Sequence, residues 1–489
     1  MSAPSIDRNE ERIAALLDRA EGKARLTGRA VLVSVTEPLG KLDPLETIEA
    51  LALASGCEGE GGNHFPTRMY WSRASDDFEI AGFGSVIHFA PAGDDRFTSI
   101  DSAWNALVGD SMIDDASRGV PGVGPTLMGG FAFDPVAQMS GNWRDFPAAL
   151  VFLPRLQLTI AGDERWLTSN AIVAPDDGPD SSLEELARLR KYVEGVRKVS
   201  RITPSNGEQG SGIRYSDALP ADEWRQIIGS AISRIRSRDL DKVVLAREER
   251  AVASRDIDIA STLRHLRAAH PDCYVFGFWH GASAFVGATP ERLVRLDGRT
   301  IRATSLAGSV RRGATPDEDS SLIGELHSSA KERREHEIVR RALHEGLSAL
   351  CDDITGAEEP TILTLKHVHH LHTAVRAHLR DGYSLLDVVA RLHPTPAVGG
   401  EPREAALRFI REREKLDRGW YAAPVGWLQR DHGEFAVALR SALITGRSAS
   451  LFAGCGIVAD SIPELEYEES LLKLRPMELA LDASQSEAT

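Results

Sequence analysis

The hydrophobic pattern of the first 200 residues changes several times between helical and β periodicity. A helical apolar repeat predicts a helix over Asn9–Ala20, and alternating valines predict a strand over Arg29–Val35. A second helix is expected over Pro44–Ser55. Aromatic residues, glycine turns and alternation then indicate β structure over His64–Pro91. The other elements expected in this half are strands over Met128–Phe133 and Ala148–Leu153 and a charged helix over Ser182–Val199.

After residue 212 the pattern has a different character. It predicts a helix over Pro220–Ser237, a short strand over Lys242–Leu245 and one long helix over Glu325–Leu350, with β structure again over Ala436–Val458. Because strands and helices come in runs rather than in strict alternation, the pattern favours an α+β fold with antiparallel sheets. A strand meander is expected over Cys273–Trp279, Ala284–Gly287 and Leu293–Leu296.

A run rich in proline, serine and glycine divides the chain. A length of 489 residues fits two or three packed units or one large composite fold. The run over 201–212 is the clearest linker signal. We therefore expect an amino-terminal α+β region over 1–200, a linker over 201–212, a second region over 213–480 and a polar tail over 481–489.

Composition and charge exclude several classes of function. The net charge is −15, whereas binding to nucleic acid or to an anionic membrane needs clustered positive charge. The four cysteines form no CxxC pair, which argues against a disulfide scaffold or a zinc ribbon. No apolar run approaches 18 residues. The sequence predicts a cytoplasmic protein that binds neither nucleic acid nor membrane, and a monomer is plausible.

Two pairs of glutamates are spaced to share a helical face. Glu332 and Glu335 lie three residues apart, as do Glu466 and Glu469. If the fold brings the pairs together, their oxygens suit Mg²⁺, a hard cation that prefers carboxylates. In a chain with 72 acidic residues, however, a single pair of this kind is usually a solvated helix face.

Histidines and glycines give weaker signals. Imidazoles at 367–372 suit zinc, but a strand directs alternate histidines to opposite faces, which favours hydrogen-bonded side chains. Cys57 stands in a partial GxCxG pattern, yet a helix is expected before it, which argues against a nucleophile elbow. No glycine-rich turn matches a loop for ATP or NAD. The residues alone thus indicate a cytosolic α+β protein, with an Mg²⁺ enzyme for a small anion as the candidate function. The histidines weighed for zinc in the segment 367–372 are His367, His369, His370 and His372.

An ordered series of motifs between Asp241 and Met477 resembles the chorismate-binding (chorismate-utilising) enzymes. Several motifs in order are far more specific than any one of them. The resemblance implies an α+β fold in which large antiparallel sheets pack as a sandwich with helices outside. It makes the region 213–480 the catalytic one. The motifs are FVGATPERL at 285–293, LAGS at 306–309, RG at 312–313, KERREH at 331–336, HPTPAVGG at 393–400, DRG at 417–419, PVGW at 424–427, AGCGIV at 453–458, and Glu466–Lys473.

Within this family the chain is most similar to the isochorismate synthases. Lys242 stands where the water-using members carry their general base, and the ammonia-using relatives lack that lysine. The resemblance implies Mg²⁺-dependent conversion of chorismate to isochorismate, by water addition at C2 and loss of the C4 hydroxyl, with Glu291 as the acid. No glutaminase subunit is expected. A salicylate synthase and a non-catalytic chorismate-binding protein remain alternatives; salicylate synthases tend to carry threonine at the position of Ala397.

The resemblance also implies the other site residues. Glu335 and Glu469 are expected to hold Mg²⁺ directly, and Glu332 and Glu466 through water. The pathway stays open between menaquinone and a catecholate or salicylate siderophore. The residues expected around the substrate are Gly308, His370, Thr373, Ala397, Arg440, Gly454 and Lys473.

Overall fold

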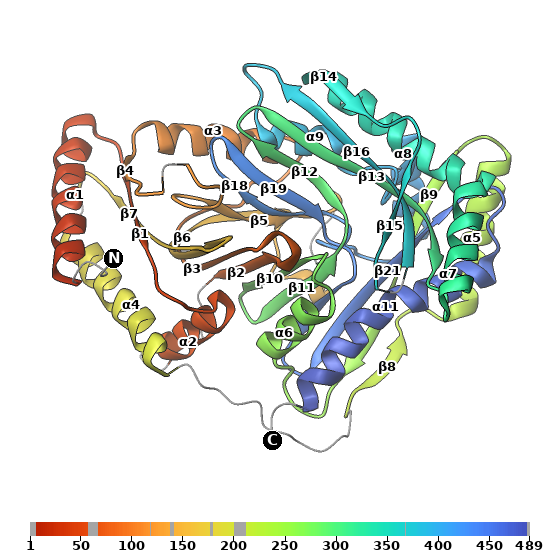
Figure 1. Ribbon diagram of the computed structural model, residues 1–489, viewed down its shortest axis with the longest axis horizontal. Helices are drawn as coiled ribbons and strands as arrows, with labels where there is room; N and C mark the ends of the chain where they lie inside the picture. Colours follow the sequence, from red (N-terminus) through yellow and green to blue (C-terminus); the bar gives the residue numbers. More distant parts are fainter. Residues whose placement is uncertain are drawn as a thin grey trace.

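The computed structural model describes residues 6–56, 67–117, 119–136, 141–176, 179–199, 212–366 and 368–486. Its strands form one extensively branched, almost entirely antiparallel sheet (Figure 1). The long strands β3 (Phe78–Phe89) and β6 (Ala149–Ala161) pair with each other at the branch point. From there two arms of strands extend, one from β3 and the other from β6, so the predicted α+β class with large antiparallel sheets is confirmed.

The first arm continues from β3 into the carboxy-terminal half of the chain. Each strand pairs antiparallel with the next, and the arm ends at β9, which begins at Lys242. The short strands β8 (Arg214–Asp217) and β17 (Gly400–Glu401) pair with β9. In order, the arm comprises β2 (Arg68–Arg73), β10 (Tyr274–His280), β11 (Ser283–Thr289), β20 (Ser441–Thr445), β21 (Ser448–Ile457) and β9 (Lys242–Val252).

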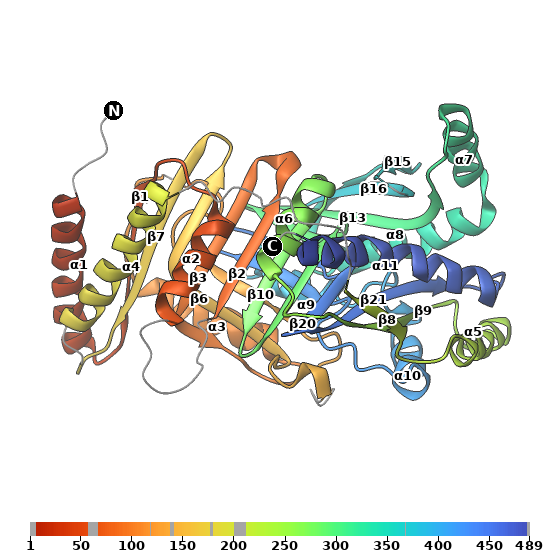
Figure 2. The same ribbon diagram turned by 90° about the horizontal axis from the view of Figure 1, so that it is seen from below.

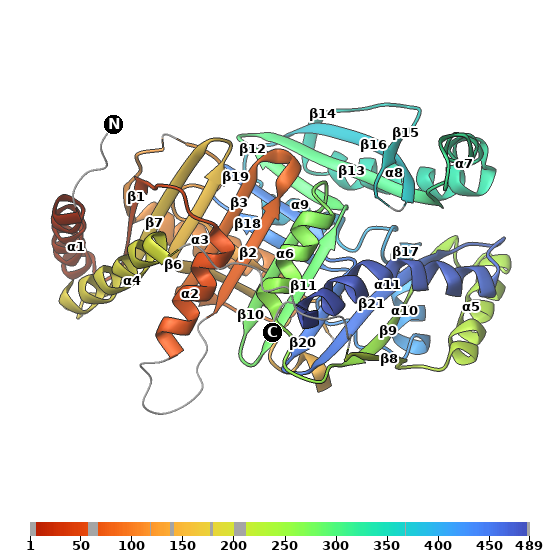
Figure 3. The same ribbon diagram turned by 60° about the horizontal axis from the view of Figure 1, so that its bottom comes forward.

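The second arm starts at β6 and ends at β16. Figure 3 shows β13 and β16 on one side of the molecule and β21 and β9 on the other, so the two arms face each other across the region that the site occupies. In order, the arm comprises β5 (Leu127–Phe131), β18 (Pro424–Leu428), β19 (His432–Val437), β12 (Arg292–Asp297), β13 (Thr300–Arg311) and β16 (Val368–Leu379). Two short strands, β14 (Cys351–Gly356) and β15 (Thr361–Thr364), pair with β16. On the other side of β6 the sheet continues through β7 (Glu164–Val173), β1 (Val31–Pro38) and β4 (Met112–Asp114).

Helices cover the outside of the sheet, and two apolar clusters hold the layers together (Figure 2). One cluster carries aromatic side chains from both arms, including Phe152, Phe278 and Trp420. The other packs helices onto the first arm, with Leu263 and Leu474 among its members. The helices are α1 (Ile6–Thr27), α2 (Pro44–Gly56), α3 (Arg96–Gly109), α4 (Pro179–Val199), α5 (Ala221–Arg236), α6 (Ile259–Ala269), α7 (Pro316–Ser328), α8 (Ala330–Ser348), α9 (Leu385–Leu392), α10 (Arg403–Arg413) and α11 (Pro463–Ser486).

The helix predicted over Glu325–Leu350 is wrong as a single element, because the chain breaks at Ser329. This residue has an extended backbone, with φ −65° and ψ 116°, and its hydroxyl accepts a hydrogen bond from the Glu332 amide at 3.3 Å. Serine followed three residues later by glutamate is the sequence signature of a helix start. The break therefore begins a new helix, α8, whose first turn carries Glu332.

The amino-terminal region completes the same sheet as the rest of the chain. Strand β2 pairs with β10, and β5 pairs with β18, so in each arm the strands of the amino-terminal half continue directly into those of the carboxy-terminal half. The proposed linker lies outside the described residues, and the domain division stays a prediction. The expected boundary at residue 480 falls inside α11, where Leu481 is buried.

Two surface properties bear on association. No described helix is long and apolar enough to cross a membrane. Helix α11 exposes Leu465, Leu472 and Leu479, which are spaced seven residues apart along its surface. This apolar stripe was not expected from the sequence, and the monomeric state stays a prediction.

A buried ion pair joins the end of the first arm to its surroundings. Arg418 donates to Glu414 at 2.6 Å and to the carbonyl oxygens of Val244 and Val398, while Glu414 accepts from the Ala246 amide at 2.8 Å. Both charged side chains are almost fully buried. The pair thus fixes β9 against the loop that follows α9.

Breaking this pair should cost much more stability than breaking a surface pair. Glu414→Gln leaves the Arg418 charge buried without its partner, so we expect the free energy of unfolding to fall by about 3 kcal/mol or more. Urea unfolding measures it. Glu223→Gln is the matched control, because Glu223 pairs with Lys415 at the surface and should change the value by less than about 1 kcal/mol. Equal effects of the two substitutions would contradict the assignment.

Candidate active site

Helix α8 and strand β13 together position the first pair of carboxylates. Gly308 has φ +78° and lies at a bulge in the pairing of β13 with β16. The bulge turns the Ser309 amide so that it donates to Glu332 Oε2 at 3.0 Å. A Cβ at Gly308 would lie 3.2 Å from that same carboxylate, so glycine provides both the turn and the space. Burial, together with the nearby charge of Glu335, raises the pKa of Glu332.

The start of helix α11 carries the second pair of carboxylates, together with a lysine one turn further on. Lys473 Nζ lies 2.6 Å from Glu469 Oε1 and donates to the Gly454 carbonyl at 3.0 Å. Glu466 is buried and lies 3.5 Å from Lys331 Nζ. Burial and the charge of Glu469 raise the pKa of Glu466. The spacing of 466, 469 and 473 places all three on the helical face toward β21.

Lys242, the first residue of β9, is buried to 1% exposure and pairs with a carboxylate. Its Nζ donates to Glu335 Oε1 at 2.7 Å. Burial alone would raise the pKa of Glu335, but the charge of Lys242 and its hydrogen bond lower it overall. Gly456 on the neighbouring strand leaves room for this pair, because a Cβ there would lie 2.7 Å from Glu335 Oε1.

Glu291 is a buried acid at the end of β11. Its amide donates to Thr289 Oγ1 at 3.2 Å, and its carbonyl accepts from the Val437 amide. Burial raises the pKa of Glu291 to about 7, although the charges of Lys242 and Lys473 act in the opposite direction. A carboxyl with this pKa can be protonated at neutral pH and can therefore act as an acid.

Arg440 supplies a cation that has no ion-pair partner among the described residues. Its backbone is left-handed, with φ 47°, which for a residue other than glycine is strained. Burial and the charges of Arg440 and Lys473 lower the pKa of His370 to about 3, so its ring is neutral. In the described part of the chain, its Nε2 atom has no hydrogen-bond partner.

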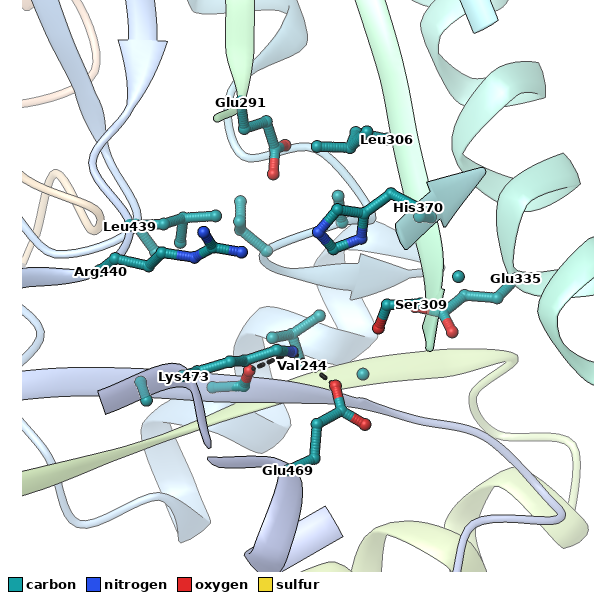
Figure 4. Close-up of a pocket in the computed structure, with 18 of the residues that line it drawn as sticks. Val244, Glu291, Leu306, Ser309, Glu335, His370, Leu439, Arg440, Glu469 and Lys473 are labelled. Carbon is teal, nitrogen blue, oxygen red and sulfur yellow. Dashed lines mark hydrogen bonds and ion pairs between the residues drawn. The ribbon is translucent and has the colours of Figure 1, made fainter. Parts of the chain in front are cut away.

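These side chains surround one cavity with a volume of about 110 Å³. Figure 4 shows Glu291 on one side of it, Lys473 and Glu469 on the opposite side, and Arg440 and His370 between them. An unpaired arginine and an unpartnered imidazole nitrogen fit a polar anion. Four carboxylates at the same cavity fit a hard divalent cation. The cavity can therefore bind an anion and a cation together.

Known proteins are similar to this chain along almost its whole length. The family model described as "Chorismate binding enzyme" matches residues 17–482. The chain belongs to the chorismate-binding enzymes. It is 36% identical to isochorismate synthase MenF of Bacillus subtilis, over 94% of this chain and 95% of that protein. It is 35% identical to the salicylate biosynthesis isochorismate synthase of Pseudomonas aeruginosa, over 95% and 93%.

Solved structures of chorismate-binding enzymes share the fold. The menaquinone-specific isochorismate synthase MenF from Escherichia coli superposes with a TM-score of 0.73 and 25% identity, covering 95% of this chain and 99% of that one. Anthranilate synthase component I from Streptococcus pneumoniae has a TM-score of 0.68 at 18% identity, covering 90% and 100%. At that identity the second likeness concerns the fold alone. Chorismate is the substrate that family membership implies.

Most residues that the sequence analysis proposed for this chorismate-binding enzyme reach the cavity. Two do not line it. Lys242 lies behind Glu335, and Thr373 is buried, with its hydroxyl 2.8 Å from His336 Nε2. Those that line the cavity are Glu291, Gly308, Glu332, Glu335, His370, Ala397, Arg440, Gly454, Glu466, Glu469 and Lys473.

The proposed Mg²⁺ ligands are held by lysines rather than gathered at one point. The compact group of possible metal ligands consists of Cys455, Glu466 and Glu469, whose donor atoms lie within 4.8 Å of one another. Glu335 is outside this group and pairs with Lys242. The four carboxylates still face one cavity, so the donor set fits a cation once the lysines withdraw.

The sequence analysis assigned no role to several residues that contribute to the site. Lys331 lies between the glutamate pairs, 3.5 Å from Glu466 and 3.7 Å from Glu332. Tyr421 lines the cavity just before Ala422, which has φ 60°. Lys331 is part of the motif KERREH and Tyr421 lies just before PVGW, so their positions in the sequence could have indicated that they contribute to the site.

The histidine segment is explained without zinc. His369 lies between Asp319 Oδ1 and Thr364 Oγ1, each 2.9 Å from a ring nitrogen, whereas the neighbouring His370 faces the cavity. This agrees with the alternation expected of a strand. His367 and Cys57 lie outside the described residues.

The raised pKa of Glu291 predicts a pH-dependent stability. Because the folded protein holds this proton more tightly than the unfolded chain does, the stabilising contribution is complete below the unfolded pKa of about 4.5 and is lost as the pH rises through about 7. Glu291→Gln cannot ionise and escapes this loss. From pH 5 to pH 8 the variant should gain up to about 3 kcal/mol over the wild type, as measured by urea unfolding. A difference independent of pH would contradict the assignment.

Proposed function

We propose that this chain is an isochorismate synthase, which isomerises chorismate to isochorismate in an Mg²⁺-dependent reaction. The observation that carries the proposal is the presence of two opposite roles: a buried lysine at the start of β9, hydrogen-bonded to the cavity residue Glu335, and a buried carboxyl at the cavity whose pKa is about 7. Water needs a base to attack a ring carbon, and a departing hydroxyl needs an acid. Relatives at 35–36% identity that carry the name isochorismate synthase support the proposal.

In this proposal, different residues of the chain have different chemical roles. Lys242 takes the proton from the water that attacks C2, and Glu291 donates its proton to the hydroxyl that leaves C4. Arg440 and Lys473 bind the substrate carboxylates, because both cations face the cavity. Neutral His370 offers its unpartnered nitrogen to a substrate oxygen. Fixing the substrate in this way places the ring between base and acid.

Four carboxylates are proposed to hold the Mg²⁺ ion. Glu335 and Glu469 are the direct ligands, and Glu332 and Glu466 act through water, in keeping with the preference of Mg²⁺ for oxygen and retained waters. When bound, the ion neutralises a substrate carboxylate and fixes its position. The lysines that pair with these glutamates must then move aside, and Lys331, with about a third of its side chain exposed, has solvent on one side.

The proposal is tested by product analysis. The purified protein with chorismate and Mg²⁺ should yield isochorismate on chromatography, and Lys242→Ala should lower turnover by about a hundredfold or more. Salicylate with pyruvate would instead identify a salicylate synthase, and no turnover would identify a binding protein. Lys415→Ala, at an exposed lysine that does not line the cavity, is the control and should retain full activity. Equal rates for Lys242→Ala and the wild type would remove Lys242 as base.

A methyl group added at Gly456 should disturb the Lys242–Glu335 pair without a change of charge. The new Cβ would lie 2.7 Å from Glu335 Oε1 and 2.8 Å from Lys242 Cε, so both side-chain ends must move. We expect kcat to fall about tenfold or more, since small displacements of reacting groups are costly. Gly324→Ala in α7, where no heavy atom lies within 4 Å, should leave kcat unchanged. An unchanged kcat in Gly456→Ala would show that the position of the pair does not matter.

A further inference from the structure

Cys455 lies at the cation site, yet the proposed reaction gives it no role. It stands on β21 between Gly454 and Gly456, which both line the cavity. Its side chain is fully buried, and its thiol donates to the Glu466 carbonyl at 3.2 Å. Because side chains alternate along a strand, Cys455 does not itself line the cavity but points to the other face of β21, toward the start of α11.

The thiol lies within ligand distance of two carboxylates. Cys455 Sγ and one carboxylate oxygen each from Glu466 and Glu469 lie within 4.8 Å of one another, and no other group of three such donors is found in the described ranges. Two ligands of one tetrahedral zinc ion, at bonds of about 2.0–2.3 Å, lie about 3.5 Å apart. The donors therefore need to approach one another by up to about 1.3 Å to bind a common ion.

We propose that Cys455, Glu466 and Glu469 form a mixed thiolate–carboxylate site that binds a thiophilic divalent cation such as Zn²⁺ or Cd²⁺ in competition with Mg²⁺. The inference rests on the cation site of the proposed function but not on its reaction. Sulfur ligands select soft cations, whereas Mg²⁺ prefers oxygen alone. As the sulfur–metal bond forms, the thiol proton leaves to solvent and the hydrogen bond to the Glu466 carbonyl is lost.

Binding of such an ion has a structural consequence. Glu469 would leave Lys473, to which it is now paired at 2.6 Å, and Glu466 would leave Lys331. Both glutamates would then be unavailable to Mg²⁺. The soft cation is thus expected to inhibit the enzyme, and excess Mg²⁺ is expected to weaken its binding.

Titration of the metal-free, full-length protein with Cd²⁺, without chorismate, tests the site directly. A bound thiolate gives a ligand-to-metal charge-transfer band in the ultraviolet, which does not depend on turnover. Cys455→Ser should lose the band and bind Cd²⁺ at least about tenfold more weakly. Cys273→Ser and Cys351→Ser, at buried cysteines outside this group, are the matched controls. They should keep the charge-transfer band and the affinity for Cd²⁺.

Glu469→Gln separates a three-ligand site from a lone thiol. If the carboxylate is a ligand, this variant also binds Cd²⁺ about tenfold more weakly. Unchanged affinity in Glu469→Gln, or an unchanged band in Cys455→Ser, overturns the proposal. Circular dichroism checks folding, and Cys455→Ala replaces the serine variant if that one is unfolded. A Cd²⁺ band with no chorismate turnover removes the proposed function only, and turnover with no band removes this inference only.

Discussion

The buried contact between Lys242 and Glu335 is the interaction on which the rest of the site depends. A buried ammonium without a partner is strongly destabilising, so β9 and α8 must meet with their charged groups within hydrogen-bonding distance. That requirement fixes the position of one sheet arm against the other, because β9 ends the first arm and α8 follows β13 of the second. Gly456 is required at the contact for the same reason, since any side chain there would enter it.

Charge balance at the cavity explains how an acidic protein can bind an anion. Four glutamates face three lysines, and each lysine lies against at least one of the carboxylates. Arg440 stands beside this group without an ion-pair partner in the described part of the chain, and its charge balances the one negative charge that remains. The net charge of −15 therefore does not describe the cavity. A divalent cation would convert the balanced group into a positive one, which favours a dianionic ligand.

Sequence reasoning predicted what local patterns determine and missed what depends on long-range contacts. Local patterns located β10, α2 and α5 closely, because β10 is a short apolar run bounded by turns and the two helices each bury one regular face. Motif order identified the family and placed eleven of thirteen proposed residues at one cavity. Thr373 lies three residues after His370 on β16, so strand alternation turns it away from the cavity, but that its partner there is His336 depends on how α8 packs against the sheet. The serine and glutamate that mark a helix start at Ser329 are visible in the sequence, but the helical repeat on both sides of them predicted one continuous helix.

The pKa of Glu291 connects these constraints to catalysis. Burial raises it, and the charges of Lys242 and Lys473 lower it, so the value of about 7 reflects a balance of opposing effects. A dianionic ligand beside Glu291 disfavours a second carboxylate through like-charge repulsion and raises this pKa further. If the carboxylates of this ligand also bind Lys473, that lysine lowers the pKa of Glu291 less. Substrate binding itself would then hold Glu291 protonated, which is the state an acid needs when the hydroxyl leaves.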